Sequence, residues 1–343
     1  MLARVRLNVQ QTNFLSRRLC LLFAALLFAD IAGAQQNSEP LEVVRIRPNL
    51  YMIAGAGSNI AVQTGPQGTV LVDAGAAEAA GQVLSTHQKL SDQPIRYILD
   101  TSADADHVGG NARLSQAGRS FLLGTNPYHP DLLPPPSGSP AKPTGNSYPA
   151  SIMAPESVLR RMTAPTGKPS LFPSEGWPTE SFSDRRRYVY LNHEGIEMFR
   201  QPNARSDADS IVFFRASDVI AAGDIVDITR FPAIDLEHGG SIQGEIAALN
   251  RVIELAVRPI PFPFEGGGTY IIPGHGRVLT TADVVDYRDM VVTVRDILQD
   301  MLQRHMTLDQ IESASPTKPY EPLYGSNSRD FIRAVYQSLT KNN

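Results

Sequence analysis

Three short segments of the sequence place aspartate or histidine beside glycine, each directly after an apolar run. The first is residues 104–110, the second contains Asp224, and the third surrounds His275. Loops at strand ends carry many reactive groups of α/β folds, and glycine lets the backbone approach a bound ion closely. Imidazole and carboxylate groups are ligands of divalent metal ions. Together the segments predict a metal site, although an acidic turn that caps a helix is an ordinary alternative for the first one.

The composition narrows the kind of metal site and the class of protein. The 343 residues include seven histidines and one cysteine, so a cysteine-rich zinc ribbon and a disulfide framework are excluded. Hydrophobic residues make up 42% and charged residues 19%, which is typical of a globular protein. The 31 basic and 35 acidic residues nearly cancel. This balance argues against a nucleic-acid partner, and we expect a small-molecule substrate.

Residues 1–34 have the pattern of a secretory signal peptide. Four arginines precede an apolar run at residues 19–28, and small residues occupy positions 32–34. The run has about ten residues, whereas a stable membrane helix needs about 20. We therefore expect cleavage after Ala34, no stable membrane span afterwards, and an exported protein that is periplasmic or secreted. An uncleaved anchor is the alternative. Cys20 lies in this run, so the mature chain would lack cysteine, which suits export.

The rest of the chain alternates twice between strands and helices. Apolar runs and turn-forming glycines predict strands at residues 43–47, 50–53, 59–63, 69–73 and 95–99, with a helix at 76–89. A second group of strands is expected at 187–191, 196–199, 210–214, 219–221 and 269–272, with helices at 241–256, 282–304 and 328–339. Residues 126–178 hold about half of the 26 prolines and predict a long surface excursion with one helix at 156–162. We expect one domain over residues 41–340, built from two packed sheets with helices outside.

The order of the segments resembles that of the metallo-β-lactamase superfamily of metal-dependent hydrolases. The likeness rests on the turn that ends at Asp73, the step formed by Asp106, His107 and two glycines, the Gly-Asp step at Asp224, and the Gly-His-Gly step at His275. It covers about residues 41–280. The resemblance implies an α/β fold, an αββα sandwich with the metal site at one edge. It also implies that Asp73 supports the ligands without touching the ion itself.

Three of the superfamily's ligand positions carry residues that suit a metal poorly. In the superfamily's His-x-His-x-Asp-His motif, the two leading histidines are replaced by Ser102 and Asp104, and a later histidine is replaced by Arg205. The resemblance assigns these positions to the first of two metal ions. A guanidinium has a permanent charge and no lone pair for a metal. We therefore expect Arg205 to lie within salt-bridge reach of Asp104, where the charge of the first ion would be.

The ligands of the second ion are all present. The resemblance assigns this ion to Asp106, His107 and His275, with Asp224 in the bridging position. Two imidazoles and two carboxylates suit Zn²⁺, and they also suit Mn²⁺ or Fe²⁺, because no thiolate biases the choice. We expect one ion rather than two.

These residues predict a hydrolase that activates water on a single divalent ion. Asp224 would serve as a ligand or as a general base, and Arg205 would stabilise an oxyanion. The substrate class stays open among lactams, thioesters, lactones and phosphoesters, because a fold does not fix a function. The alternative from another class is a non-catalytic binding protein that kept the fold and lost the first-metal ligands.

Overall fold

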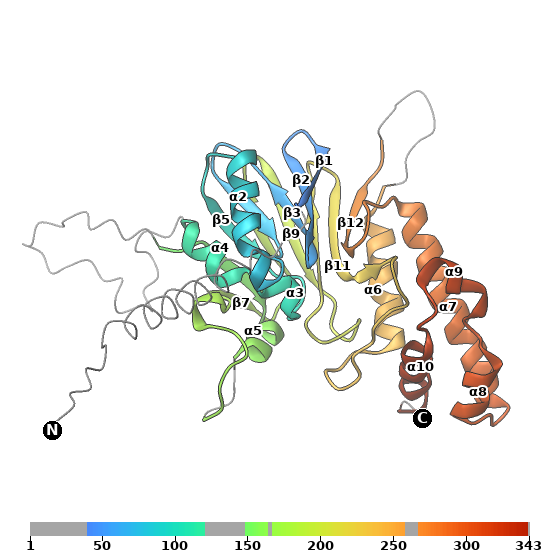
Figure 1. The fold of residues 1–343 in the computed structure, drawn as a ribbon. Helices are drawn as coiled ribbons and strands as arrows, with labels where there is room; N and C mark the ends of the chain where they lie inside the picture. Colours follow the sequence, from blue (N-terminus) through green and yellow to red (C-terminus); the bar gives the residue numbers. More distant parts are fainter. Residues whose placement is uncertain (1–39, 121–147, 164–166, 258–266, 342–343) are drawn as a thin grey trace, which may run out of the picture. The chain divides into compact units, whose positions relative to one another are not determined.

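The structure is a computed structural model that describes residues 40–120, 148–163, 167–257 and 267–341 (Figure 1). All of its helices and strands belong to one compact unit, Leu41–Asn343. The predicted signal peptide and residues 126–147 of the proline-rich stretch lie outside the described residues. Within the four ranges given, no helix has both the length and the apolar character needed to cross a membrane.

The first sheet has seven strands in the order β1-β2-β3-β4-β5-β6-β7. Strands β1 to β4 form an antiparallel meander, and the pairing is parallel from β4 to β7. The parallel part brings the carboxyl ends of β4, β5 and β6 to one edge. The bounds are β1 Glu42–Arg47, β2 Leu50–Ala56, β3 Ser58–Gln63, β4 Thr69–Val72, β5 Ile95–Leu99, β6 Ser151–Pro155 and β7 Glu180–Phe182.

The second sheet has five strands in the order β12-β11-β10-β9-β8. Strands β8 to β11 are antiparallel neighbours, and β12 joins β11 in parallel. The ends of β11 and β12 therefore point to the same edge of this sheet. The bounds are β8 Arg186–Leu191, β9 Glu194–Arg200, β10 Ser210–Phe214, β11 Val219–Asp227 and β12 Tyr270–His275.

Helices cover the outer face of each sheet (Figure 1). Helices α2 (Ala80–Leu90) and α4 (Asn111–Ala117) lie on the first sheet, and α6 (Ile242–Leu255), α7 (Thr281–Gln303) and α10 (Arg329–Lys341) lie on the second. The shorter helices are α3 (Ala105–Val108), α5 (Glu156–Met162), α8 (Leu308–Ala314) and α9 (Glu321–Tyr324), with 3₁₀ turns at Ala77–Ala79, Ser174–Gly176 and Lys318–Tyr320.

Apolar side chains from both sheets form the central core. Met52 of β2 and Val70 of β4 belong to the same buried cluster as Met198 of β9 and Val212 of β10. Outside the sheets, Val83 and Leu114 attach α2 and α4 to the first sheet, and Leu249 and Val291 attach α6 and α7 to the second. The layers are therefore helix, sheet, sheet and helix, which is the αββα sandwich implied by the resemblance.

Local sequence explains where the covering helices begin. The Ser241 hydroxyl caps α6 by accepting the Gly244 N–H at 3.0 Å. Helix α7 begins with a capping box, in which Thr280 and Asp283 satisfy each other's backbone N–H groups. Such caps pair backbone donors that have no partner within the helix, and each contributes about 1 kcal/mol.

The expectation of a surface excursion over residues 126–178 was too broad. Helix α5 begins and ends where the sequence predicted, at Glu156–Met162. The five residues before it form β6, whose side chains are all buried between β5 and β7. A buried parallel strand shows no polar alternation, and the surrounding prolines concealed this short apolar run. The proline-rich stretch therefore contributes part of the first sheet.

Candidate metal centre

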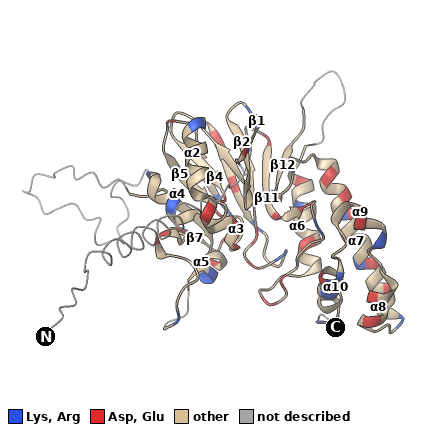
Figure 2. Cartoon of the chain, viewed as in Figure 1, with Lys and Arg blue, Asp and Glu red and all other residues tan. Residues whose placement is uncertain are grey.

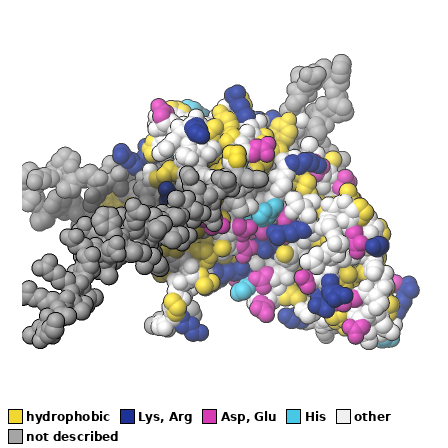
Figure 3. Space-filling model, viewed as in Figure 1, with side chains coloured by type: hydrophobic (Ala, Val, Ile, Leu, Met, Phe, Trp, Pro, Cys, Tyr) yellow, Lys and Arg dark blue, Asp and Glu magenta, His cyan; other side chains and the backbone are white. Residues whose placement is uncertain are grey.

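The predicted site residues come from four separate parts of the chain and meet at one edge of the sandwich. Asp73 directly follows β4, Asp106 and His107 lie on α3 after β5, Asp224 lies in β11, and His275 ends β12. In the space-filling view, a histidine, arginines and a group of acidic side chains gather near the middle of the visible face (Figure 3). The strand ends thus bring together residues up to 202 positions apart, from Asp73 to His275.

His107 is fully buried and held from both sides. Its Nδ1 lies 2.9 Å from Oδ2 of Asp73, and its Nε2 lies 3.1 Å from Oδ1 of Asp224. Asp73 also accepts the Thr101 N–H at 2.8 Å and the Thr101 hydroxyl at 2.7 Å. The carboxylate of Asp73 therefore fixes the ring of His107 with Nε2 directed into the site. Asp73 has a φ of +66°, a conformation that aspartate adopts more readily than most residues.

His275 completes the group from the opposite sheet. Its Nε2 lies 3.2 Å from Oδ2 of Asp106 and 3.3 Å from Oδ1 of Asp224. This approach requires glycine at position 274, because a Cβ there would overlap Oδ1 of Asp224. Asn59 of β3 donates to the Pro273 carbonyl at 3.0 Å and to the Gly276 carbonyl at 2.9 Å, which ties the His275 segment to the first sheet.

Three of the converging atoms are buried and have no hydrogen-bond partner. They are Nε2 of His107, Nε2 of His275 and Oδ1 of Asp224. The ligand atoms of Asp106, His107 and His275 all lie within 4.8 Å of one another. Unpaired buried lone pairs that face each other are costly, and a divalent cation bound by nitrogen and oxygen ligands relieves that cost. The residues present therefore fit a metal ion.

The charges of the site shift its pKa values strongly. The carboxylate of Asp106, and then that of Asp224, lies close to Nε2 of His275 and raises the pKa of this histidine to about 9. Burial alone would lower the pKa of His107, but Asp73 and Asp224 outweigh it and raise that pKa well above its usual value. Burial would raise the pKa of Asp224, yet His107, His275 and Arg205 hold it well below its usual value. The site thus strongly favours positive charge between its carboxylates.

The three replaced ligand positions also converge. A guanidinium nitrogen of Arg205, Nη2, forms an ion pair with Asp104 and lies 3.4 Å from the Ser102 hydroxyl. The salt bridge expected between Arg205 and Asp104 is therefore confirmed. The Arg205 side chain is only 12% exposed, so its charge is placed inside the site.

Arg205 touches the same aspartate that the histidines touch. Its Nη2 lies 3.4 Å from Oδ2 of Asp224, and its Nε lies 4.0 Å from Oδ1 of Asp209. Three carboxylates thus surround one guanidinium. The guanidinium thus lies among residues at the positions where the resemblance places ligands of a first metal ion, and Arg–carboxylate pairs of this kind are strong and directional.

Sequence reasoning missed a second arginine at the site. Nη2 of Arg230 lies 3.8 Å from Oδ2 of Asp224, and its Nε lies 2.5 Å from Oδ2 of Asp227. The Arg230 side chain is 51% exposed, so it lies at the mouth of the site. The spacing of Asp224, Asp227 and Arg230 by three residues each was the available signal, but it is common in loops and carries little information alone.

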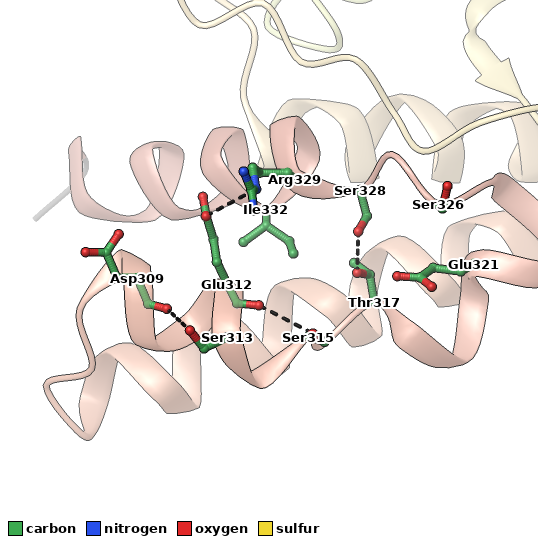
Figure 4. Close-up of a pocket in the computed structure, with 10 residues that line it drawn as sticks. All are labelled: Asp309, Glu312, Ser313, Ser315, Thr317, Glu321, Ser326, Ser328, Arg329 and Ile332. Atoms are coloured by element: carbon green, nitrogen blue, oxygen red, sulfur yellow. Dashed lines mark hydrogen bonds and ion pairs between the residues drawn. The ribbon is translucent and has the colours of Figure 1, made fainter.

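Two cavities of the described residues are large enough to admit a small ligand. A cleft of about 580 Å³ opens beside His275, and Val44, Met52, Ala54 and Val278 give it an apolar wall. A groove of about 350 Å³ lies among α8, α9 and α10 (Figure 4). Its Glu312 is paired with Arg329, and these helices carry interspersed acidic and basic residues (Figure 2). Only the first of these two cavities contains a residue of the metal centre.

Comparisons with solved structures show the same fold. The stereoselective inverting sec-alkylsulfatase Pisa1 from Pseudomonas sp. superimposes with a TM-score of 0.59 at 14% identity, and a double mutant of this sulfatase gives 0.60. Both matches cover 87% of this chain, which spans only 50% of the sulfatase chains. A metallo-beta-lactamase from Pontibacter korlensis gives 0.51 at 14% identity, covering 74% of this chain and 99% of its own.

Sequence comparison adds a family to the fold. No curated protein matches the chain significantly. The family model of the metallo-beta-lactamase superfamily matches residues 53–193, a range that includes Asp73, Asp106 and His107. Asp224 and His275 lie beyond this range and are placed by the geometry alone. The matched region and the αββα fold agree, and residues 53–193 match the metallo-beta-lactamase superfamily domain.

Proposed function

We propose that the protein is a metal-dependent hydrolase that holds one divalent ion between Asp106, His107, Asp224 and His275. The observation that carries this proposal is the convergence of three buried, unpaired donor atoms on His107, His275 and Asp224. The superfamily match and the hydrolase structures with the same fold support it. Zn²⁺ is the first choice, because two imidazoles and two carboxylates satisfy it, while Mn²⁺ and Fe²⁺ accept the same donors.

When bound, the ion supplies a Lewis acid that lowers the pKa of water and polarises the bond to be cleaved. Nε2 of His107 and Nε2 of His275 would hold it, together with an oxygen of Asp106 and Oδ1 of Asp224. Asp73 keeps the proton on Nδ1 of His107, which leaves Nε2 free to donate its lone pair. The strongly lowered pKa of Asp224 makes this carboxylate a poor proton acceptor, so we assign it as a ligand rather than as the general base.

In this proposal the guanidinium of Arg205 takes the place of the first of the two metal ions in a two-metal site. Its guanidinium is anchored by Asp104 and touches Asp224, so its positive charge stays fixed while a substrate binds. A fixed positive charge beside the reacting bond stabilises the negative charge that develops on a carbonyl, phosphoryl or sulfuryl oxygen. Arg230, at the mouth of the site, adds a second positive charge on the solvent side.

The substrate is a small molecule, and the apolar cleft beside His275 provides room for an apolar group next to the scissile bond. We place the mature enzyme outside the cytoplasm, in the periplasm or the medium. Lactams, thioesters, lactones and phosphoesters remain the substrate classes to test, and the sulfatase structures of the same fold add alkyl sulfates to that set.

The proposal is tested by metal content and hydrolysis on the same preparation. The mature protein, purified without chelator, is expected to contain about one ion per chain and to hydrolyse at least one substrate class. His275→Ala should lose both the ion and the activity, while His305→Ala, at an exposed histidine in the turn between α7 and α8, should lose neither. A protein without bound metal, and with the same behaviour after His275→Ala, would instead support the non-catalytic binding protein.

A further inference from the structure

A second concave surface, distinct from the metal centre, is lined mainly by arginine. It is a groove of about 700 Å³ formed by the start of β8, the end of β9 and one side of α6. Arg185 directly precedes β8, Arg186 begins it, Arg200 ends β9, and Arg251 lies on α6. Three separate elements therefore direct four guanidinium groups to one cavity, which we call the arginine groove.

The positive charge of the arginine groove is largely uncompensated. Its one acidic lining residue is Glu254, which lies 3.3 Å from Nη1 of Arg251. Among the residues that the structure describes, no carboxylate lies within 4.0 Å of a guanidinium nitrogen of Arg185, Arg186 or Arg200. The like charges of these arginines repel each other, and a bound anion relieves that repulsion. A concave surface also concentrates the positive electrostatic potential, which further favours anion binding in the groove.

Three of the four guanidinium groups contact other groups of the protein, and one of them, that of Arg186, lies with its central carbon 5.1 Å from the centre of the exposed Tyr188 ring. The guanidinium carbon of Arg251 lies 4.9 Å from the centre of the Phe199 ring, an arrangement that orients a guanidinium plane. Nη1 of Arg200 donates to the Ser183 carbonyl, and its Nε is buried without an acceptor. The groove is therefore partly preorganised, and the buried Nε of Arg200 has lost water without gaining an acceptor.

We propose that the arginine groove binds a small ligand that carries at least two phosphoryl or sulfuryl groups. The paired N–H groups of a guanidinium match two oxygens of a phosphoryl or a sulfuryl group. Four guanidinium groups are more than a single oxyanion needs as partners. The volume admits a molecule larger than one oxyanion. The proposal is independent of hydrolysis, because the groove shares no lining residue with the metal centre.

Isothermal titration calorimetry with inorganic pyrophosphate and with a disulfated disaccharide tests this inference on the protein as purified. We expect one binding site per chain for at least one probe, with affinity that falls as salt is raised. Arg185→Gln and Arg251→Gln should each weaken binding about tenfold, since a charged hydrogen bond contributes on that order. Arg304→Gln, which removes an equal charge from a remote exposed helix position, should leave the affinity unchanged.

The metal centre supplies the decisive control, because pyrophosphate also binds metal ions. Binding that persists in His275→Ala and weakens about tenfold in Arg185→Gln places the ligand in the arginine groove. The probe that binds more tightly then identifies the phosphoryl or the sulfuryl group. Binding that is lost in His275→Ala and kept in Arg185→Gln would overturn the proposal. Retention of long polyanions such as heparin with no binding of either small probe would overturn it as well.

Discussion

Arg205 and Asp224 meet at 3.4 Å, from Nη2 to Oδ2, while the other oxygen of Asp224 lies 3.1 Å from Nε2 of His107. One carboxylate thus divides the site into two halves. Its Oδ1 faces the histidines that would hold a metal ion, and its Oδ2 faces a permanent cation of the protein. In a two-metal site both oxygens would face ions. This division of one carboxylate between two cationic partners underlies the proposal of a single metal ion.

Restoring the lost histidines should restore the second ion. In the triple variant Ser102→His, Asp104→His and Arg205→His, the guanidinium is gone and three imidazoles converge where Arg205 now meets Ser102 and Asp104. We expect the metal content, measured by inductively coupled plasma mass spectrometry, to rise from about one ion per chain toward two. Arg205→His alone should raise it less, since two ligands would still be missing. An unchanged content in a folded triple variant would mean that the backbone has moved away from ligand geometry.

Asp73 should tune the metal affinity without touching the ion. Asp73→Asn keeps a residue that tolerates a positive φ but removes the charge that holds Nδ1 of His107 at 2.9 Å. Loss of such a partner typically weakens metal binding about 10- to 100-fold, which competition with a chromogenic chelator measures. Asp283→Asn, at the N-terminus of α7, is the matched control and should bind the ion normally. Equal affinity in Asp73→Asn and the native protein would show that Asp73 acts on the fold alone.

Metal binding should depend steeply on pH. The nearby carboxylates of Asp106 and Asp224 raise the pKa of metal-free His275 to about 9, so the imidazole is protonated at neutral pH and must lose its proton to bind an ion. The apparent affinity should therefore fall about tenfold for each pH unit below 9, and more steeply where His107 also releases a proton. Calorimetry in buffers of different ionisation enthalpy should detect this proton release. If the affinity for the ion does not change between pH 6.5 and pH 8.5, the assignment of these imidazoles as ligands is refuted.

The strand ends that carry the site and the ion pair of Arg205 with Asp104 were predictable from sequence, whereas β6 and the position of Arg230 were not. Asp106, His107, Asp224 and His275 stand beside glycines after apolar runs, and β-strand ends gather such residues at one edge. Strand β6 escaped prediction because a buried parallel strand lacks polar alternation. Arg230 escaped because only the three-dimensional structure shows which loop side chain turns toward Asp224.

Asp209 should make the stability of the metal-free protein depend on pH in an unusual direction. Burial raises its pKa to about 6, although Arg205 opposes the shift. The folded protein therefore holds a proton there that the unfolded chain, with a pKa near 3.9, releases. The stability from this group is fully present below about pH 4 and is lost as the pH rises through 6, a change of about 3 kcal/mol.

Asp209→Asn isolates this effect, because asparagine does not titrate in that range. The free energy of unfolding of the native protein minus that of Asp209→Asn, from urea denaturation with chelator present, should decrease between pH 4 and pH 7. A difference that stays constant, or that increases, would show that Asp209 is ionised in the folded protein throughout this range.

Anomalous X-ray diffraction from crystals of the zinc-loaded protein tests the central claim most directly. Data collected on both sides of the zinc absorption edge should show one peak per chain, about 2.0–2.2 Å from Nε2 of His107, Nε2 of His275 and a carboxylate oxygen of Asp224, with the Arg205 guanidinium still paired to Asp104. No peak at these atoms, or a second peak in place of the Arg205 guanidinium, would contradict a single-metal hydrolase.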